Sequence, residues 1–377
     1  MPSKKPQINT ADASLNHGYQ NLQKMRFSLS ISPSFSRANL KTLVSDSFVN
    51  RIKRNADKIH DLIFTCHIEP FMVDAHGVML TKAENEIHLR HMVELQNKTG
   101  VQVSPVFNNI HVPNTYNNLE IFVENFKPIY DMGVTSMTMP HLLWMKMGLL
   151  QKTFPKLVIK NTVLRRVRNG QDFWNHAEAG YDYINLDRVL VRETKTLREI
   201  RAAQQKFEEL TGKHVYTSML SGEGCFGYCP LPEEHHQHTL THPETSENMQ
   251  KNLEIFRCPQ ELYCQNIGDH FYNPLFSVGL PGFKSDFDEM CENFDVIKLV
   301  GRRAFRSLTD NLDKIEAFLS SPEPFSYDAT PVLEMLHGNP EKYGKLLDRW
   351  RKKTKDCRFQ CWNCSLCSDI ISKGIES

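Results

Sequence analysis

Residues 181–218, YDYINLDRVLVRETKTLREIRAAQQKFEELTGKHVYTS, decide the fold. The stretch begins with Tyr181–Leu186 and ends with His214–Ser218, and both segments have the β-rich composition of short strands. Between them, residues 194–211 carry apolar side chains at helical spacing on an otherwise polar background. A strand, an amphipathic helix and a second strand in this order are typical of a parallel βαβ unit.

The same alternation extends in both directions from this unit. Six further segments have strand patterns: Phe27–Ile31, Leu62–Cys66, Val101–Phe107, Val134–Met139, Leu157–Asn161 and Phe294–Leu299. Helical spacing is expected at residues 37–60, 83–99, 117–131, 142–152, around Phe173, and at 308–319. Pro105 weakens the third strand if that strand is central, because proline has no N–H to donate. Repeated strand–helix units of this number predict an α/β fold, a closed (β/α)8 TIM-type barrel.

Three regions follow from this prediction. Residues 1–25 have the polar composition of a flexible tail, and residues 26–321 form the barrel. Within the barrel, residues 222–293 are too long for an ordinary loop and are expected to carry the site and some local helix. Residues 322–377 are a C-terminal extension that we expect to lie on the barrel.

The composition narrows the functional classes. With 45 Lys and Arg against 44 Asp and Glu, the net charge is +1, which gives no general attraction to nucleic acid or anionic membrane. There is no run of 18 apolar residues, so no membrane span is expected. Residues 1–23 show no apolar core of a secretory signal, so we expect a reducing cytoplasm. In that compartment clustered thiols bind metals more often than they pair.

The C-terminal cysteines carry the strongest chemical signal. They have the spacing C-x3-C-x2-C-x2-C, formed by Cys357, Cys361, Cys364 and Cys367. Four thiolates this close in sequence are within reach of one iron–sulfur cluster or one zinc ion. We therefore predict a metal site here, with a [4Fe-4S] cluster as the first choice and zinc as the alternative.

A second cysteine pair follows the strand that ends the opening βαβ unit. Cys225 and Cys229 lie after a glycine-rich turn and supply half of a metal site, so two more ligands are needed. Cys258 or the C-terminal cysteines could provide them. His235 and His236 follow directly and are candidates for acid–base work near neutral pH, although a solvated polar loop is an equally good explanation.

Polar side chains also follow the predicted strands, where function collects in a barrel. Glu69 and Asp187, like the two histidines, are candidates for proton transfer. The candidates for holding a small polar or anionic substrate are Asn109, Asn161, Arg188, Lys298 and Arg302. Any one of these side chains could instead cap a helix or tie two loops together.

Taken together, these motifs resemble the U32 peptidase-like superfamily. Three segments carry the resemblance: Ser221-Gly-Glu-Gly-Cys225-Phe-Gly-Tyr-Cys229-Pro, Asp295-Val-Ile-Lys298-Leu-Val-Gly301-Arg302, and Tyr181-Asp-Tyr-Ile-Asn-Leu186 with its following Asp-Arg. The resemblance implies a (β/α)8-type barrel, a [4Fe-4S] cluster held by four cysteines, and hydroxylation of ubiquinone precursors or RNA bases without molecular oxygen.

The chain departs from the pattern of that superfamily in three ways. Leu299-Val300 replaces Ile-Glu, the cysteine pair is closer, and the C-terminal four-cysteine run is extra. We interpret the chain as a divergent branch, so the substrate is not carried across from the superfamily.

Three hypotheses about function follow. The first is an iron–sulfur oxidoreductase of oxygen-independent hydroxylase type, acting on a small molecule with a redox partner. The second is an RNA-modification factor, because the basic run 349–355 precedes aromatic-bearing cysteines. The third is a peptidase-like or non-catalytic protein in which metal only fastens the tail. Peptidase activity has little support, because neither a His-Glu-x-x-His nor a Gly-x-Ser-x-Gly motif is present.

Overall fold

A computed structural model describes residues 19–31, 42–71, 81–221, 228, 233, 283–299 and 338–375. Eight parallel strands form a barrel in which each strand pairs with the next and β1 pairs with β8. The strands are β1 (Arg26–Ile31), β2 (Ile59–Thr65), β3 (Val103–Val106), β4 (Ser136–Thr138), β5 (Val158–Lys160), β6 (Tyr183–Asn185), β7 (Tyr216–Ser221) and β8 (Val296–Leu299). The predicted TIM-type barrel and all eight predicted strands are confirmed.

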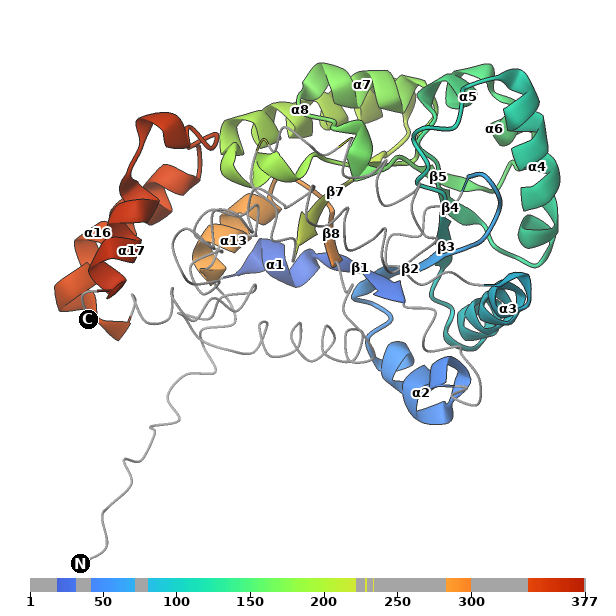
Figure 1. Ribbon diagram of the computed structural model, residues 1–377, viewed down its shortest axis with the longest axis horizontal. Coiled ribbons are helices and arrows are strands. Elements are labelled where there is room, and N and C mark those ends of the chain that lie inside the picture. Colours follow the sequence, from blue (N-terminus) through green and yellow to red (C-terminus); the bar gives the residue numbers. More distant parts are fainter. Residues whose placement is uncertain are drawn as a thin grey trace, which may run out of the picture.

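Helices surround the barrel, and the C-terminal pair lies to one side, beyond α8 and α13 (Figure 1). The α-helices are α1 (Gln20–Lys24), α2 (Asp46–Arg54), α3 (Lys82–Thr99), α4 (Tyr116–Asp131), α5 (Leu142–Met147), α6 (Leu149–Thr153), α7 (Gly170–Glu178), α8 (Thr194–Thr211), α13 (Lys284–Cys291), α16 (Pro340–Thr354) and α17 (Leu366–Ile375). Short 3-10 turns are η3 (Thr42–Val44), η4 (Val163–Arg165), η5 (Arg188–Arg192) and η7 (Cys361–Asn363). The predicted helix at 308–319 lies outside the described residues.

Two predicted helices differ in extent from the observed ones. The helix expected over 142–152 is broken into α5 and α6 at Gly148, whose φ of +71° is left-handed and ends the first helix. The helix expected over 37–60 is wrong at its C-terminal end. It stops at Arg54, with Asn55 as its cap, because Ile59 already belongs to β2. Residues 20–24, inside the predicted tail, form α1, whose Leu22 N–H donates to Asp288 on α13 at 2.7 Å.

Pro105 lies inside the barrel wall, and the pairing of β3 accommodates it. The N–H of Phe107 donates to Thr138 on β4 at 3.1 Å, so odd-numbered residues of β3 direct their backbone toward β4. Pro105 therefore faces β4 with no N–H to donate. As a consequence, β3 and β4 pair only at Val106 and Thr138, while β3 pairs with β2 over four positions.

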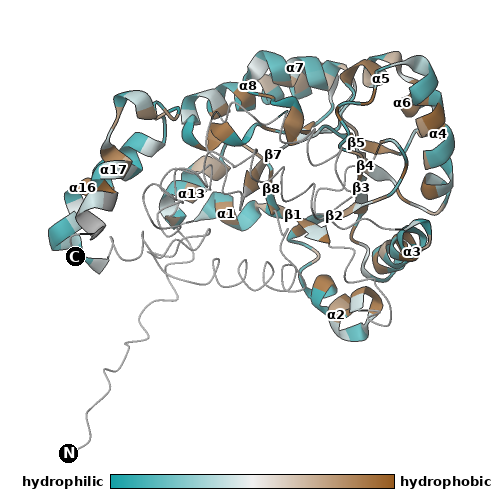
Figure 2. Cartoon of the chain, in the orientation of Figure 1, coloured by the Kyte–Doolittle hydropathy of each residue, from teal (hydrophilic) through white to brown (hydrophobic). Residues whose placement is uncertain are grey.

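The apolar core lies between the barrel wall and the helices. Leu29, Leu62 and Phe64 face away from the barrel interior and belong to one buried cluster with the inner faces of the helices. In Figure 2 the apolar colouring accordingly follows the strands and the inner helix faces, with hydrophilic residues outside. Among the described helices, none is both long enough and apolar enough to cross a membrane.

Candidate functional site

The interior of the barrel is unusually polar. Strands β1 and β2 lie across the barrel from β5 and β6, so side chains that join them must cross the interior. Lys160 forms an ion pair with Asp61, Asp61 also accepts a hydrogen bond from Ser28, and the hydroxyls of Ser28 and Tyr183 are 3.3 Å apart. These four side chains are almost wholly buried, with Asp61 0% and Lys160 3% exposed. Barrel interiors are ordinarily filled by Val, Ile and Leu.

Burial and charge shift the pKa values of this group. Burial lowers the pKa of Lys160 below its usual value, although the carboxylate of Asp61 opposes that shift. For Asp61, burial favours a higher pKa, but the charge and hydrogen bond of Lys160 outweigh it and lower the pKa. Burial raises the pKa of Tyr183, so its hydroxyl keeps its proton. Burial also lowers the pKa of His60 to about 4, so this neighbour stays neutral at pH 7.

A β-bulge in β2 brings the adjacent residues His60 and Asp61 toward the barrel interior. The register between β1 and β2 shifts between Phe27 and Ser28, so that Phe27 pairs with Ile59 and Ser28 with Asp61. His60 is the extra residue of this bulge, and its ring lies 5.2 Å from that of Tyr183. Further hydroxyls extend the polar interior, since Ser104 and Ser136 are 3.0 Å apart and Ser218 donates to Asn185 at 3.1 Å.

The structure places some predicted site residues in structural roles. Asn161 accepts from the N–H of Asn185 at 2.6 Å, so the two buried amides tie β5 to β6. Asn109 donates to the carbonyl of Pro70 at 2.6 Å and thereby joins two loops. Glu69 lies 3.2 Å from the ring of its neighbour His67, and its side chain is 80% exposed.

Other predicted residues lie closer to the barrel mouth. Asp187 is buried, accepts from Arg168 at 2.6 Å and caps η5 through the N–H of Val189 at 3.1 Å. Arg188 is half-buried at the start of η5, and Lys298 is half-buried on β8, in register with Ser28. The remaining predicted residues lie outside the described residues: Cys225, Cys229, His235, His236, Cys258 and Arg302.

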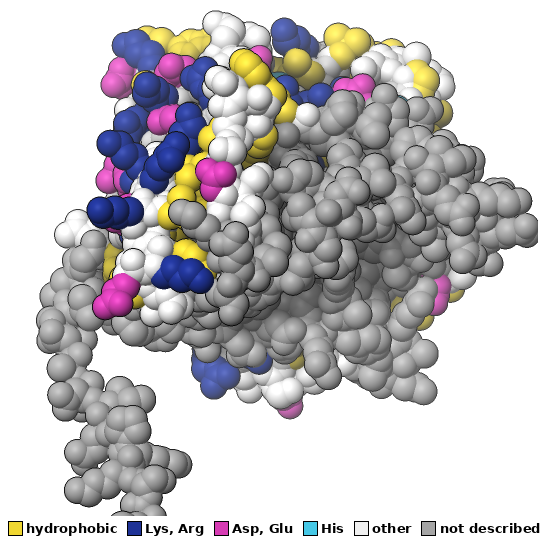
Figure 3. Space-filling view, turned by 60° about the vertical axis from the view of Figure 1, so that its left-hand side comes forward, with side chains coloured by type: hydrophobic (Ala, Val, Ile, Leu, Met, Phe, Trp, Pro, Cys, Tyr) yellow, Lys and Arg dark blue, Asp and Glu magenta, His cyan; other side chains and the backbone are white. Residues whose placement is uncertain are grey.

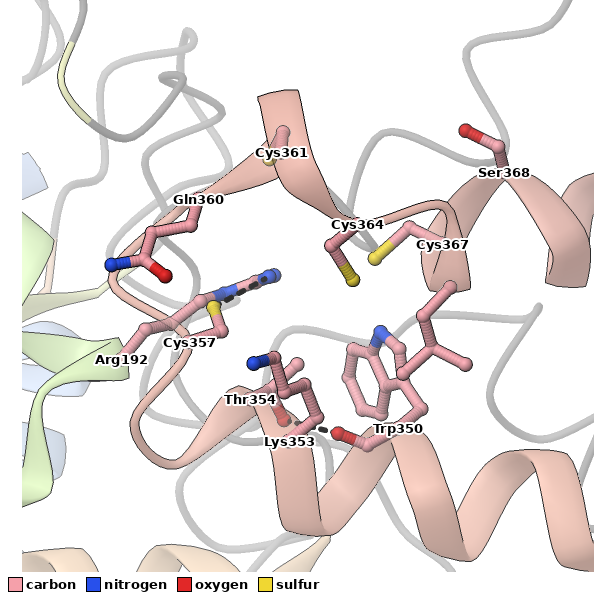
Figure 4. Close-up of a pocket in the computed structure, with 11 residues that line it drawn as sticks. Arg192, Trp350, Lys353, Thr354, Cys357, Gln360, Cys361, Cys364, Cys367 and Ser368 are labelled. Carbon is pink, nitrogen blue, oxygen red and sulfur yellow. Dashed lines mark hydrogen bonds between the residues drawn. The ribbon is translucent and has the colours of Figure 1, made fainter.

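The C-terminal cysteines meet in one pocket. We call residues 340–375, comprising α16, η7 and α17, the cysteine unit. Its four cysteines are free thiols that line a pocket of about 160 Å³, together with Arg192 from the barrel and Trp350 from α16 (Figure 4). The cysteines are Cys357, Cys361, Cys364 and Cys367. The structure therefore places the four predicted cysteine ligands around one pocket, and metal binding there stays a prediction.

The cysteine unit is attached to the carboxyl end of the barrel. The N–H and hydroxyl of Thr194 both donate to the carbonyl of Lys355 at 2.9 Å, and the N–H of Arg358 donates to the carbonyl of Arg192 at 3.3 Å. Both barrel residues follow β6, on the side where barrel enzymes hold their substrates. Tyr228 reaches the same contact, because its ring lies 6.4 Å from that of Phe359.

Arg192 links the barrel to the thiols. Its side chain is buried, its Nη1 lies 3.9 Å from the Sγ of Cys357, and its guanidinium is 4.7 Å from the ring centre of Phe359. Burial raises the pKa of Cys361 and of Cys367, and the charge of Arg192 partly offsets both shifts. Metal binding at these thiols must therefore displace protons.

The donor set fits a thiolate-bound metal, since four thiols line one pocket beside a fixed positive charge. Their side chains have not converged on one point. Among the residues that the structure describes, no three Cys, His, Asp or Glu side chains are close enough to hold a metal ion. Cys357, Cys361, Cys364 and Cys367 are the residues that would hold it.

Sequence reasoning missed the interior pair and Arg192. A signal for the pair was present, because Lys160 and Asp61 are charged residues within or beside apolar strand segments. Charges in such positions face the interior of a barrel whenever their neighbours face the helices. Arg192 gave no signal, because its relation to Cys357 exists only once the C-terminal segment has folded back on the barrel.

Several solved structures are similar to the chain. The U32 peptidase Mk0906 shares 12% sequence identity over 80% of this chain and 98% of its own, with a TM-score of 0.46. A deoxyribose phosphate aldolase from Aeropyrum pernix shares 12% identity, with 55% and 84% covered and a TM-score of 0.31. The YdjI aldolase from Escherichia coli K12 shares 8%, with 93% and 95% covered and a TM-score of 0.36. No sequence-family model and no curated protein matches the chain.

The first of these structures is a U32 peptidase, a member of the group that the sequence motifs resemble. These similarities concern the fold alone, at low sequence identity. Substrate and reaction are therefore argued below from the residues of this chain.

Proposed function

We propose that this protein is a (β/α)8-barrel oxidoreductase in which the cysteine unit holds a [4Fe-4S] cluster beside the barrel mouth. The proposed reaction is an oxygen-independent, hydroxylase-type modification of a small polar or anionic molecule. The observation that carries the proposal is the pocket in which four free thiols meet Arg192 at the carboxyl end of the barrel. A thiolate-bound cluster would supply electron transfer there.

The chain's own residues support this proposal by what they hold in place. The charge of Arg192 lowers the pKa of Cys361 and of Cys367 against the effect of burial, which favours the thiolate form that a metal needs. Trp350 lines the same pocket and shields one side of it from water. In the barrel, Lys298 stands in register with Ser28 beside an interior lined with hydroxyls, which suits a polar or anionic substrate.

Anaerobic purification followed by iron, sulfide and zinc analysis tests the proposal. The expected result is about four irons and four sulfides per chain, with a broad absorption band at roughly 400 nm. Cys364→Ser should lower the metal content strongly, whereas Cys66→Ala, at a buried thiol outside the pocket, should leave it unchanged. One zinc per chain without iron would overturn the redox proposal and favour a metal that only fastens the cysteine unit.

The RNA-modification hypothesis has less support. Of the basic run, Arg351 pairs with Asp286 at 2.7 Å and Lys355 pairs with both Asp286 and Glu289, so these charges face α13. On the face that Figure 3 shows, Lys and Arg side chains are interspersed with Asp and Glu. RNA binding that weakens steeply with rising salt would restore this hypothesis.

A further inference from the structure

Burying the ion pair between Lys160 and Asp61 costs more free energy than a purely structural contact requires. Removing two charges from water costs several kcal/mol per ion, and well-packed apolar residues at such sites are often equally stable or more so. A barrel interior needs no charge for packing, since branched apolar side chains fill it well. The pair is held further by Ser28, whose hydroxyl donates to Asp61. A buried, hydrogen-bonded charge pair of this kind indicates function.

The position of Lys160 fits a reacting group. It is the last residue of β5, so its side chain lies in the half of the barrel nearest the carboxyl ends, where substrates enter. Its Nζ lies 4.8 Å from the ring centre of Tyr183, which stabilises a positive charge at that nitrogen. Asp61 contacts the same nitrogen and can accept its proton.

The buried environment of Lys160 also favours the neutral form of its amine. Burial penalises the charged form of both partners, which narrows the free-energy gap between the ion pair and the neutral pair that forms when the proton moves from Lys160 to Asp61. The direction of the Lys160 pKa, lowered by burial, agrees with this. Desolvation favours the neutral, nucleophilic form of a lysine, and the adjacent carboxylate supplies a base for its proton.

We propose that Lys160 forms an imine with a small carbonyl compound, an aldehyde or an oxo acid, bound in the barrel. Asp61 takes a proton from the ammonium, and the amine nitrogen then attacks the carbonyl carbon. A C–N bond forms, the C=O π bond opens, and a proton passes from the nitrogen to the carbonyl oxygen, which becomes a hydroxyl. Asp61 returns the proton to that hydroxyl, which leaves as water. The protonated imine keeps a positive charge over the ring of Tyr183. This proposal stands apart from the metal proposal, because it uses no residue of the cysteine unit.

Reductive trapping of the full chain tests the inference directly. The protein is incubated separately with pyruvate and glycolaldehyde in the presence of sodium cyanoborohydride, and the modified lysines are identified by peptide mass spectrometry. We expect one of these carbonyl compounds to modify Lys160 roughly tenfold faster than exposed lysines, because binding in the barrel holds the carbonyl carbon beside the amine. Labelling spread evenly over surface lysines, with Lys160 unmodified, would overturn the inference.

Variants sharpen the result. Lys160→Met should abolish the fast label, whereas Lys156→Met, at an exposed lysine just before β5, should leave it in place. Because Lys160→Met leaves Asp61 buried without its partner, Asp61→Asn serves as a second variant that keeps the amine. It removes the acid that protonates the departing hydroxyl, so labelling should slow about tenfold or more. Circular dichroism establishes that each variant is folded before labelling. An unchanged rate in folded Asp61→Asn counts against the proton transfer and overturns the mechanism. The result is the same in protein purified with or without metal, so it fails or succeeds independently of the metal proposal.

Discussion

His88 and His141 are two of the least exposed ionisable side chains, at 0% and 1%. His88 packs its ring edge against Phe64 with 5.5 Å between ring centres, and His141 lies 4.3 Å from the ring of Trp144. Burial lowers the pKa of His88 to about 3 and that of His141 to about 4. Both histidines are therefore neutral parts of the apolar framework at pH 7, and they carry no proton in the folded state until the pH is well below neutral.

The free energy of unfolding should consequently fall as the pH drops from 6.5 to 4. In that window the unfolded chain, whose histidines titrate near 6.5, binds more protons than the folded chain, so acid favours unfolding. Each histidine can contribute up to about 1.4 kcal/mol per pH unit. Urea unfolding at pH 7, 6 and 5 measures the slope, and His88→Gln should reduce it. A free energy that stays constant between pH 6.5 and 5 would contradict the neutral assignment.

At the scale of the elements, the positions of the strands can be predicted from the sequence, but the residues that face the barrel interior cannot. Each strand is a short apolar run between turn signals, and such runs are recognisable without knowing their partners. The inward-facing set depends on closure of the barrel and on the bulge at His60, neither of which leaves a local signal. For this reason the second strand was expected to begin at Leu62, one residue after the buried Asp61.

Only some helix ends can likewise be predicted from the sequence. Gly148 splits an expected single helix because of its left-handed backbone, whereas α3 begins and ends where its caps predict. In α3 the Thr81 side chain accepts from the N–H of Glu84, the Glu84 carboxylate accepts from Thr81 in return, and Gly100 closes the helix with φ +74°. Caps within one segment can be read from sequence, whereas breaks that are decided by tertiary packing cannot.

Two glycines in left-handed conformations should tolerate alanine differently. At Gly100 a Cβ would meet nothing within 4 Å, so Gly100→Ala should cost only the backbone strain, about 1 kcal/mol. At Gly180, with φ +102°, a Cβ would lie 2.7 Å from the Nε2 of Gln151. That amide donates to the carbonyls of Met145 at 3.1 Å and Ala179 at 3.4 Å, so displacing it breaks two bonds.

Gly180→Ala should therefore destabilise the protein by about 1–3 kcal/mol more than Gly100→Ala, since buried polar groups lose partners. Parallel urea unfolding curves of the two variants and the unmodified protein give the difference. Equal losses would show that Gln151 can move without cost.

At the scale of the whole molecule, the cysteine unit is held by two different parts of the barrel. Contacts from Thr194 and Arg192 join it to the start of α8 and to η5. On the other side Arg351 donates to Asp286 at 2.7 Å and to Ser285 at 2.9 Å, at the start of α13. The start of α8 follows β6 and therefore lies at the carboxyl end of the barrel. The end of α13 leads into the amino end of β8, so the first turn of α13 is the part of that helix farthest from the amino end. The thiol pocket is thus carried beside the barrel mouth by contacts that do not involve the thiols.

Breaking the α13 attachment should loosen the cysteine unit while leaving the barrel intact. Arg351 is about one quarter exposed, its guanidinium also lies 4.2 Å from the ring centre of Phe283, and Arg351→Met removes both the charge and the hydrogen bonds. Losing a charged hydrogen bond of this kind costs about 1.5–3 kcal/mol. Hydrogen exchange of α16 amides should accordingly become on the order of tenfold faster, while amides of β2 and β6 keep their rates. Arg349→Met is the matched control, because this exposed arginine lies half a turn away on the same helix. If the α16 amides exchange at the same rate in both variants, the contact with α13 does not hold the cysteine unit. If the amides of β2 and β6 also exchange faster in Arg351→Met, the cysteine unit is an integral part of the barrel and not an extension lying on it.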